Sequence, residues 1–375
     1  MIIMEMLQTN AKWLAEIREK AKKDFESLPL PQEREEAWRY TNLRKMGIDF
    51  KSSDASSVMI ECDNDKAIAV DFATAVQKHP DMMKKYFGRL VKGNDKISAF
   101  HFANFSDGVF ICVPKNERAV VSVVFETANA HNIIVTEEGA SLDYSEQLTG
   151  DTITTPTDAT EIFANENSAV SFSSLQNFGL NTNAFSVKNA QVERNASVKW
   201  TFLSAGGKLY RLHASTEFAG EGANAETICA SLSRENQHID ITTNAYHKVP
   251  HTANNILAKS VLLDSSTAVY RGHIKIDPGA QQTNSYLSDH MLMVGEKALA
   301  NSIPSLDIQA NDVKASHGST TGQIDEEQLF YLESRGLPRE EAEKLIIQGF
   351  LLPVLARITN AEMRKSFAQS IGVEE

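Results

Sequence analysis

Cysteine is scarce in this 375-residue chain, which contains only Cys62, Cys112 and Cys229. Three cysteines spaced so widely do not suit a disulfide framework, and none belongs to the Cys-x-x-Cys pair of a closed zinc site. Such sparse use is typical of a protein of the reducing cytosol. None of the three has a basic neighbour in the sequence, so we expect buried and unreactive thiols.

Long hydrophobic runs are missing as well. The first residues, MIIMEMLQTNAKW, lack the basic and apolar stretches of a signal peptide, and the apolar run over residues 350–356 is too short to span a bilayer. The net charge of −12 argues against a nucleic-acid or anionic-membrane surface. Because neither GxxxxGKS/T nor GxGxxG occurs, we expect no ATP hydrolysis and no dinucleotide binding by this chain.

Helical patterns are concentrated toward the two ends of the chain. We predict helices over residues 1–30, 34–46 and 70–105, and therefore an N-terminal helical region over residues 1–108. The segment 34–46 is short and charged and carries Trp38, which we expect to pack against the middle of the protein.

The C-terminal part, residues 317–375, is predicted to be a second helical domain. Asp325 is placed to cap its first helix, and Gly336 is placed to end it. Pro338 can begin a second helix, and Thr359 is placed to cap a third.

The middle of the chain, residues 109–316, is rich in β-branched residues between Gly, Asn and Asp, and is predicted to be the β core. A faint repeat runs through it, in which a small turn residue precedes an alternating stretch. Its copies begin at Gly139, Asn167, Asn195, Gly222 and Ser265, at intervals of 28, 28, 27 and 43 residues. A near-constant period favours a β-solenoid, in which each coil stacks on the last, over a β-sandwich, which also gives turn signals.

Residues 284–352 carry the most specific pattern in the chain. Strand-like segments lead to Ser-His-Gly at residues 316–318, followed by a T-x-G-x-I turn, the segment QLFYLESRG and then PREEAEKLIIQGF. This order resembles the end of the core domain in the SufB/SufD family of iron–sulfur cluster assembly proteins. The resemblance covers most of residues 30–370 and includes the segment REEAWRYT near the start.

Two positions distinguish the paralogues of that family. SufB-type chains carry a cysteine after an acidic-lysine pair, where this sequence has Ala298, and an acidic motif where it has Ser-His-Gly. The chain therefore resembles the SufD type more than the SufB type. Some SufD-type chains also carry a cysteine two residues before the histidine, but Ala315 stands there and leaves His317 alone.

The resemblance implies a right-handed parallel β-helix with N-terminal and C-terminal α-helical domains. It implies a non-catalytic cytoplasmic scaffold that assembles with one SufB and two copies of the ATPase SufC. Clusters would form at the SufB–SufD interface, with sulfur supplied through a cysteine desulfurase system. The chain alone would hold no tightly bound cofactor, only a transient cluster or iron, and could form a homodimer when SufB is absent.

Two sets of residues are candidate functional positions. His317 is the candidate ligand for iron or a nascent cluster, because neutral imidazole binds iron and can share it with a thiolate of a partner chain. A histidine that caps a strand end or a helix start is the alternative. The apolar face of the C-terminal helices is the candidate SufC-binding surface, at Leu345, Ile346, Phe350, Leu351 and Leu352.

Other interpretations stay open at this point. An apolar helical stripe is usually core, and a SufB-like chain would bind the cluster through its own thiols, against which Ala298 argues. A β-helix enzyme acting on polysaccharide would need clustered carboxylates, which are scattered here. Asp289 and His290 adjoin in a predicted strand, so we expect them to point to opposite faces and to be structural.

Overall fold

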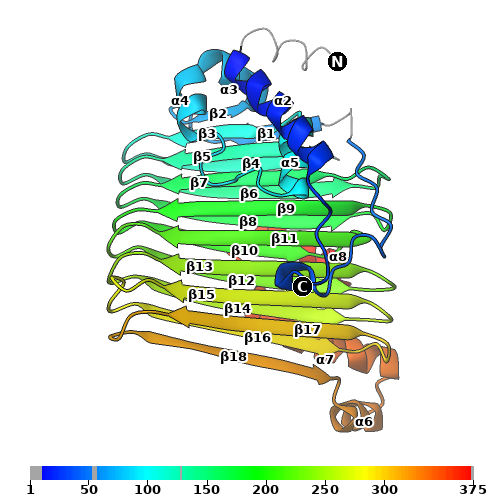
Figure 1. Cartoon of the computed structure of the whole chain (residues 1–375). Coiled ribbons are helices and arrows are strands. Elements are labelled where there is room, and N and C mark those ends of the chain that lie inside the picture. Colours follow the sequence, from blue (N-terminus) through cyan, green and yellow to red (C-terminus); the bar gives the residue numbers. More distant parts are fainter. Residues whose placement is uncertain (1–10, 53–56, 127–128, 373–375) are drawn as a thin grey trace.

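Two sheets of largely parallel strands face each other through the centre of the molecule and form a flattened solenoid (Figure 1). The computed structural model describes residues 11–52, 57–126 and 129–372. Successive strands alternate between the two sheets, so the chain winds through about seven turns. This architecture confirms the predicted mainly β fold with a solenoid core and helices on both sides of it in the sequence.

Each sheet contains nine strands. Sheet A is formed, in spatial order, by β1 (Ser57–Cys62), β4 (Arg118–Glu126), β6 (Ser141–Gly150), β8 (Ala169–Phe178), β10 (Ser197–Ser204), β12 (Asn224–Ser233), β14 (Ala253–Leu262), β16 (Asn284–Met293) and β18 (Lys314–Gln323). Sheet B is formed by β2 (Ile68–Asp71), β3 (Val109–Val113), β5 (Ala130–Thr136), β7 (Thr157–Ala164), β9 (Asn183–Val192), β11 (Leu209–Phe218), β13 (His238–His247), β15 (Thr267–Ile276) and β17 (Leu299–Ile308).

The sequence repeat marks the turn that leads into each strand of sheet A. In four such turns one residue has a left-handed backbone, with φ values of 70°, 58°, 54° and 76° at Gly139, Asn167, Asn195 and Gly222. Glycine and asparagine adopt this conformation more readily than other residues, which explains why these two types recur. At Gly222 a Cβ atom would also lie 2.3 Å from Asn195 Oδ1 in the preceding turn, so the stacked coils leave no room for a side chain.

The fifth copy of the repeat was a wrong match. Ser265 leads into β15, which belongs to sheet B, whereas the next coil of sheet A begins after His251. His251 adopts the left-handed conformation with φ of 59°, although it is neither glycine nor asparagine. The sequence therefore gives no turn signal for this coil, and the 43-residue interval joins turns on opposite sides of the solenoid.

Stacked aromatic rings occupy part of the interior. Tyr144, Phe172 and Trp200 lie in register on β6, β8 and β10, and their ring centroids are 4.9 Å and 5.0 Å apart. Residues in register on parallel strands face the same side, so one inward aromatic ring per coil produces a column of contacting rings, parallel for Tyr144 and Phe172 and edge-to-face for Phe172 and Trp200. All three rings are buried, so the interior is a packed core at this level.

Helices pack on the outside of the solenoid near its N-terminal end. The short strands β1 and β2 run antiparallel to β4 and β3. Helices α2 (Lys12–Ser27), α3 (Phe72–Lys78), α4 (Pro80–Tyr86) and α5 (Lys96–Asn104) pack at this end, against β3, β5 and β7 (Figure 1). The helix predicted over residues 1–30 is confirmed as α2, and the first ten residues of that range lie outside the described residues.

The prediction of a helix over residues 34–46 is wrong. The segment forms a single 3₁₀ turn, Glu36–Trp38, followed by further turns. Contacts to sheet B hold it instead, since Cζ of Arg211 lies 3.7 Å from the centre of the Trp38 ring and Nη2 of Arg211 donates to the carbonyl of Ala37 at 2.8 Å. Trp38 thus packs against the solenoid as expected, but a segment this short gains more from these contacts than from helical turns.

The C-terminal helices α6 (Glu326–Ser334), α7 (Arg339–Leu355) and α8 (Ala361–Ser370) follow β18 and return along the outer face of sheet A. Asp325 caps α6 as predicted, by accepting two backbone N–H groups at 2.9 Å and 3.3 Å. Asn360, rather than Thr359, caps α8 and accepts a backbone N–H at 3.0 Å. Both residue types cap helices, so the sequence could not choose between these neighbours. Pro353 lies inside α7, which continues to Leu355.

Candidate functional site

The C-terminal end of the solenoid is open. β17 and β18 are the last strands of sheets B and A, and each is hydrogen-bonded to one neighbouring strand, β15 and β16. Figure 1 shows both strands at the opposite end of the solenoid from α2. Along their other edge, ten residues of backbone in each strand have no further strand beside them within the described part of the chain. Such edges are templates for pairing with another chain.

His317 lies in the middle of β18, and its register places it on the inward row of the solenoid. It pairs with Leu287 of β16, which is fully buried in the core. Since residues in register on parallel strands face the same side, His317 is directed toward the interior, where no later coil of the described chain covers it. It is consequently exposed at the mouth of the solenoid.

Asp289 occupies the inward row of the next strand, β16. It is only 1% exposed, and its Oδ2 accepts a hydrogen bond from Ser319 Oγ at 3.1 Å. Ser319 Oγ in turn lies 2.7 Å from Ser302 Oγ on β17, while Asp289 Oδ1 has no hydrogen-bond partner. Burial raises the pKa of Asp289, while the hydroxyls of Ser302 and Ser319 and the nearby His290 and His317 act in the opposite direction.

His290 follows Asp289 directly and belongs to the other face of β16. It is half-buried, and its Nδ1 lies 2.6 Å from Thr320 Oγ1 on β18. The expectation that Asp289 and His290 point to opposite faces is therefore confirmed. The structure instead brings Asp289 close to His317, a pairing that the strand sequence alone could not reveal because it depends on the register between two coils.

The five apolar residues predicted for partner binding do not share one surface. Leu345 and Leu352 of α7 are 49% and 62% exposed, whereas Leu351 is fully buried against the strands of sheet A. Ile346 and Phe350 are half-buried, and Lys259 of β14 donates to the carbonyl of Phe350 at 2.7 Å. The sequence analysis missed two exposed aromatic residues on the neighbouring helix α6, Phe330 and Tyr331.

The expectation of buried thiols holds for two of the three cysteines. Cys112 and Cys229 are buried, and burial raises their pKa values to about 11 and about 12. Cys62 is exposed at the last residue of β1, so the expectation is wrong there. Strand β1 lies at the other end of sheet A from β18, so Cys62 is far from His317.

A buried cluster of charges inside the solenoid was also missed. Lys188 Nζ lies 2.6 Å from Glu146 Oε1, contacts Asp158 Oδ2 and donates to Thr160 Oγ1 at 3.0 Å. Both charged ends of the Lys188–Glu146 pair are fully buried, and burial raises the pKa of Asp158 to about 7. Glu146 and Lys188 fall on the buried, inward positions of strands whose residues alternate between inside and outside. This alternation is the sequence signal that could have placed them inside.

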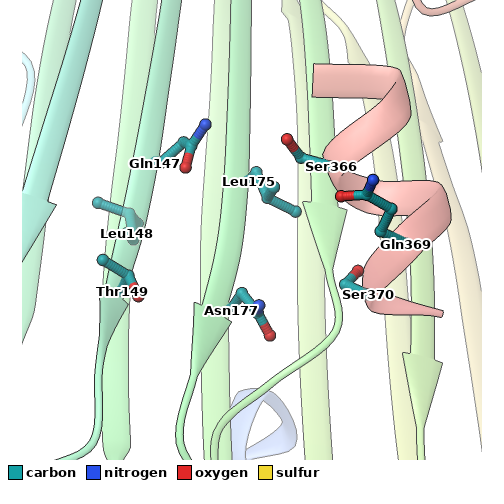
Figure 2. A pocket seen from close by; sticks show the side chains of 8 residues that line it. All are labelled: Gln147, Leu148, Thr149, Leu175, Asn177, Ser366, Gln369 and Ser370. Carbon is teal, nitrogen blue, oxygen red and sulfur yellow. The ribbon is translucent and has the colours of Figure 1, made fainter. Parts of the chain in front are cut away.

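Two surface cavities lie away from the open end of the solenoid. Figure 2 shows one of about 340 Å³ between α8 and the strands β6 and β8, lined by Gln147, Leu148, Thr149, Leu175, Asn177, Ser366, Gln369 and Ser370. None of these side chains titrates near neutral pH. A second cavity of about 310 Å³ beside Trp38 contains Arg211 and His213, but Arg211 is bonded to Asp240, and burial lowers the pKa of His213 to about 4.

Across residues 11–52, 57–126 and 129–372, no group of three or more His, Cys, Asp or Glu side chains is arranged to hold a metal ion. None of the helices described here is both long and apolar enough to cross a membrane. Any metal at the mouth of the solenoid would therefore need ligands beyond the pair of Asp289 and His317.

Comparison with known proteins gives a consistent result. Residues 119–350 match the family model described as SUF system FeS cluster assembly, SufBD core domain. The iron–sulfur cluster assembly protein SufD of Bacillus subtilis is 28% identical, over 96% of this chain and 93% of its own length. SufBD family proteins of Synechocystis and Staphylococcus saprophyticus are also 28% identical, over 88% and 92% of this chain and 73% and 76% of their own lengths.

Proposed function

We propose that this chain, which belongs to the SufBD family of the SUF iron–sulfur cluster assembly system, is the SufD-type scaffold subunit of a SUF complex. In this proposal it pairs with a SufB-type paralogue, binds the ATPase SufC and itself performs no catalysis. The observation that carries the proposal is the open end of the solenoid, where His317 faces the interior beside two free strand edges.

The free edges of β17 and β18 support pairing with a paralogue. A second solenoid of the same family could add its own last strands to both edges, because main-chain hydrogen bonds need no particular side chains. His317 would then lie inside the interface between the two solenoids, where a thiolate from the partner could bind the same iron atom or cluster. Iron and the nascent cluster are substrates in this proposal, so the isolated chain needs no resident cofactor.

The positions of the thiols favour the SufD-type role over a SufB-like one. Cys112 and Cys229 are buried with raised pKa values, so neither presents a thiolate at neutral pH. Cys62 is exposed but lies at the opposite end of sheet A from β18. Ala298, in the position where SufB-type chains carry cysteine, precedes β17 close to the open end. A cluster at this end therefore depends on thiolates of another chain.

The exposed apolar residues of α6 and α7 support binding of SufC. Phe330 and Tyr331 on α6 and Leu345 and Leu352 on α7 are exposed, and α6 and α7 contact each other. A partner that buries Leu and aromatic side chains would gain about 1.5–3 kcal/mol for each fully buried one. Leu351 instead packs against sheet A and anchors α7 to the solenoid, so it is not available to a partner.

The test is coexpression of the chain with SufB-type and SufC-type partners under reducing, low-oxygen conditions, followed by native mass spectrometry. We expect a complex with both partners. Leu352→Asp should weaken recovery of the ATPase, whereas Ile153→Asp, at an equally apolar site that is 75% exposed, should not. His317→Ala should leave the complex intact and reduce its cluster content. A lone chain or a homodimer, recovered despite both partners, would contradict the proposal.

A further inference from the structure

The pair of inward-facing side chains at the open end has the geometry of two neighbouring ligands. His317 stands opposite Leu287, and Asp289 stands opposite Ser319, so the two residues are one strand and two positions apart on the same face. That offset corresponds to roughly 8 Å between Cα atoms, from a strand spacing of about 4.8 Å and a rise of about 3.3 Å per residue. Side chains of aspartate and histidine can meet at one ion across this separation.

The hydrogen bonding of Asp289 differs from that of the other buried carboxylates in the described chain. Asp240 is paired with Arg211 and Arg271, and Glu146 and Asp158 share Lys188. Glu161 accepts N–H groups from the backbone of residues 88, 90 and 91. Each of these groups has the partners that a buried charge requires.

The partners of Asp289 are neutral serine hydroxyls, Ser319 at 3.1 Å and the nearby Ser302, and its Oδ1 has no hydrogen-bond partner although the side chain is only 1% exposed. An unsatisfied buried carboxylate oxygen is destabilising, and more so when it is charged. A structural role would not require that cost, because an asparagine or serine could accept the same hydrogen bond from Ser319. A cation at Oδ1, beside His317, would satisfy the carboxylate.

We propose that Asp289 is a second iron ligand, and that Asp289 and His317 together bind one Fe(II) ion at the mouth of the solenoid. One carboxylate oxygen and one imidazole nitrogen are ligand types that Fe(II) accepts, and they are found together in sites with open positions. Water, or side chains of a partner chain, would occupy the remaining positions. The inference rests on the proposed function, since it assigns Fe(II) as the species that this subunit binds at its interface with the SufB-type partner.

Fe(II) binding to the chain provides the test, with His290 as a matched control. Fe(II) alone is titrated anaerobically onto the full-length protein, and Co(II) is used in parallel as a spectroscopic probe. We expect Asp289→Asn and His317→Ala each to weaken Fe(II) binding on the order of ten-fold or more, the scale at which even outer-sphere changes act. His290→Ala should leave it unchanged, because His290 adjoins Asp289 but faces outward.

A second variant protects the test against a folding defect. Asp289→Cys places a thiolate donor at the same position, so it should give Co(II) a new sulfur charge-transfer absorption only if residue 289 coordinates the metal. Wild-type Fe(II) affinity in a folded Asp289→Asn protein, or no such absorption from Asp289→Cys, would overturn the inference. Recovery of the complex is measured separately, so its failure would count against the proposed function without deciding whether Asp289 binds iron.

Discussion

Lys188 is expected to be worth several kcal/mol of stability, because it is the cation that two buried carboxylates share. Lys188→Met would leave Glu146 and Asp158 next to each other inside the solenoid without a positive charge. Removing one partner of a buried ion pair typically costs about 3–5 kcal/mol. Protonation of one carboxyl group relieves part of this, and burial already raises the pKa of Asp158 to about 7.

The cost of Lys188→Met should therefore depend on pH. The lysine is one of the groups that lower the pKa of Asp158, so its removal raises that pKa further above the unfolded value. The protonated form then stabilises the variant at low pH, and this contribution is lost as the pH rises through the folded pKa. The loss of unfolding free energy relative to wild type should be larger at pH 8 than at pH 5. It can be measured by urea unfolding, followed by the fluorescence of the buried Trp200 and by circular dichroism.

Two matched variants make this prediction sharp. Lys115→Met removes an exposed ion pair with Glu138 of similar length, 2.7 Å, and should cost less than about 1 kcal/mol. Replacing Glu146 and Asp158 by Gln and Asn together with Lys188→Met should recover most of the loss, because no charge then stays buried. A cost for Lys188→Met no larger than that for Lys115→Met, or one that is the same at both pH values, would refute the reasoning.

Three further predictions concern the solenoid and its C-terminal helices. Phe172→Ala, which removes the middle ring of the aromatic stack, should lower the unfolding free energy by about 3–5 kcal/mol in urea titrations. Asn195→Ala should cost about 1–2 kcal/mol because φ is 54° there, whereas Asn195→Gly should cost less, and equal costs would contradict the conformational explanation. Asp325→Ala should cost about 1 kcal/mol and reduce the protection of amide protons in the first turn of α6, which hydrogen exchange can measure.

The solenoid could be predicted because its turns demand particular residues. Glycine or asparagine recurs where the backbone of a turn is left-handed, at Gly139, Asn167, Asn195 and Gly222. The sequence therefore contains the turn signal of a coil four times. The signal stops at His251, where the turn has the same conformation without the residue type that favours it. The helix prediction for the segment around Trp38 failed for a related reason. Contacts with Arg211 determine the structure of this segment, and no local sequence pattern indicates them.

The candidate site was predictable only in part. The motif around His317 made that residue a candidate, but its inward direction follows from the pairing of β18 with β16. Asp289 was taken as structural because a strand sequence shows the face of each residue and not its neighbours in the next coil. The apolar pattern of α7 likewise could not tell Leu351, which meets sheet A, from Leu352, which is exposed, because the direction from which the helix packs is a tertiary property.

The two ends of the solenoid are unlike, and this limits how many molecules can join. The ten-residue strands β17 and β18 offer parallel edges, whereas β1 and β2 are antiparallel strands of only six and four residues. A solenoid with two free parallel ends could add copies end to end without limit, as fibrils do. When two chains that each have one such end join, neither has a free parallel end left for a third molecule. The antiparallel strands at the N-terminal end therefore prevent further addition, and assembly through the strand edges stops at two molecules.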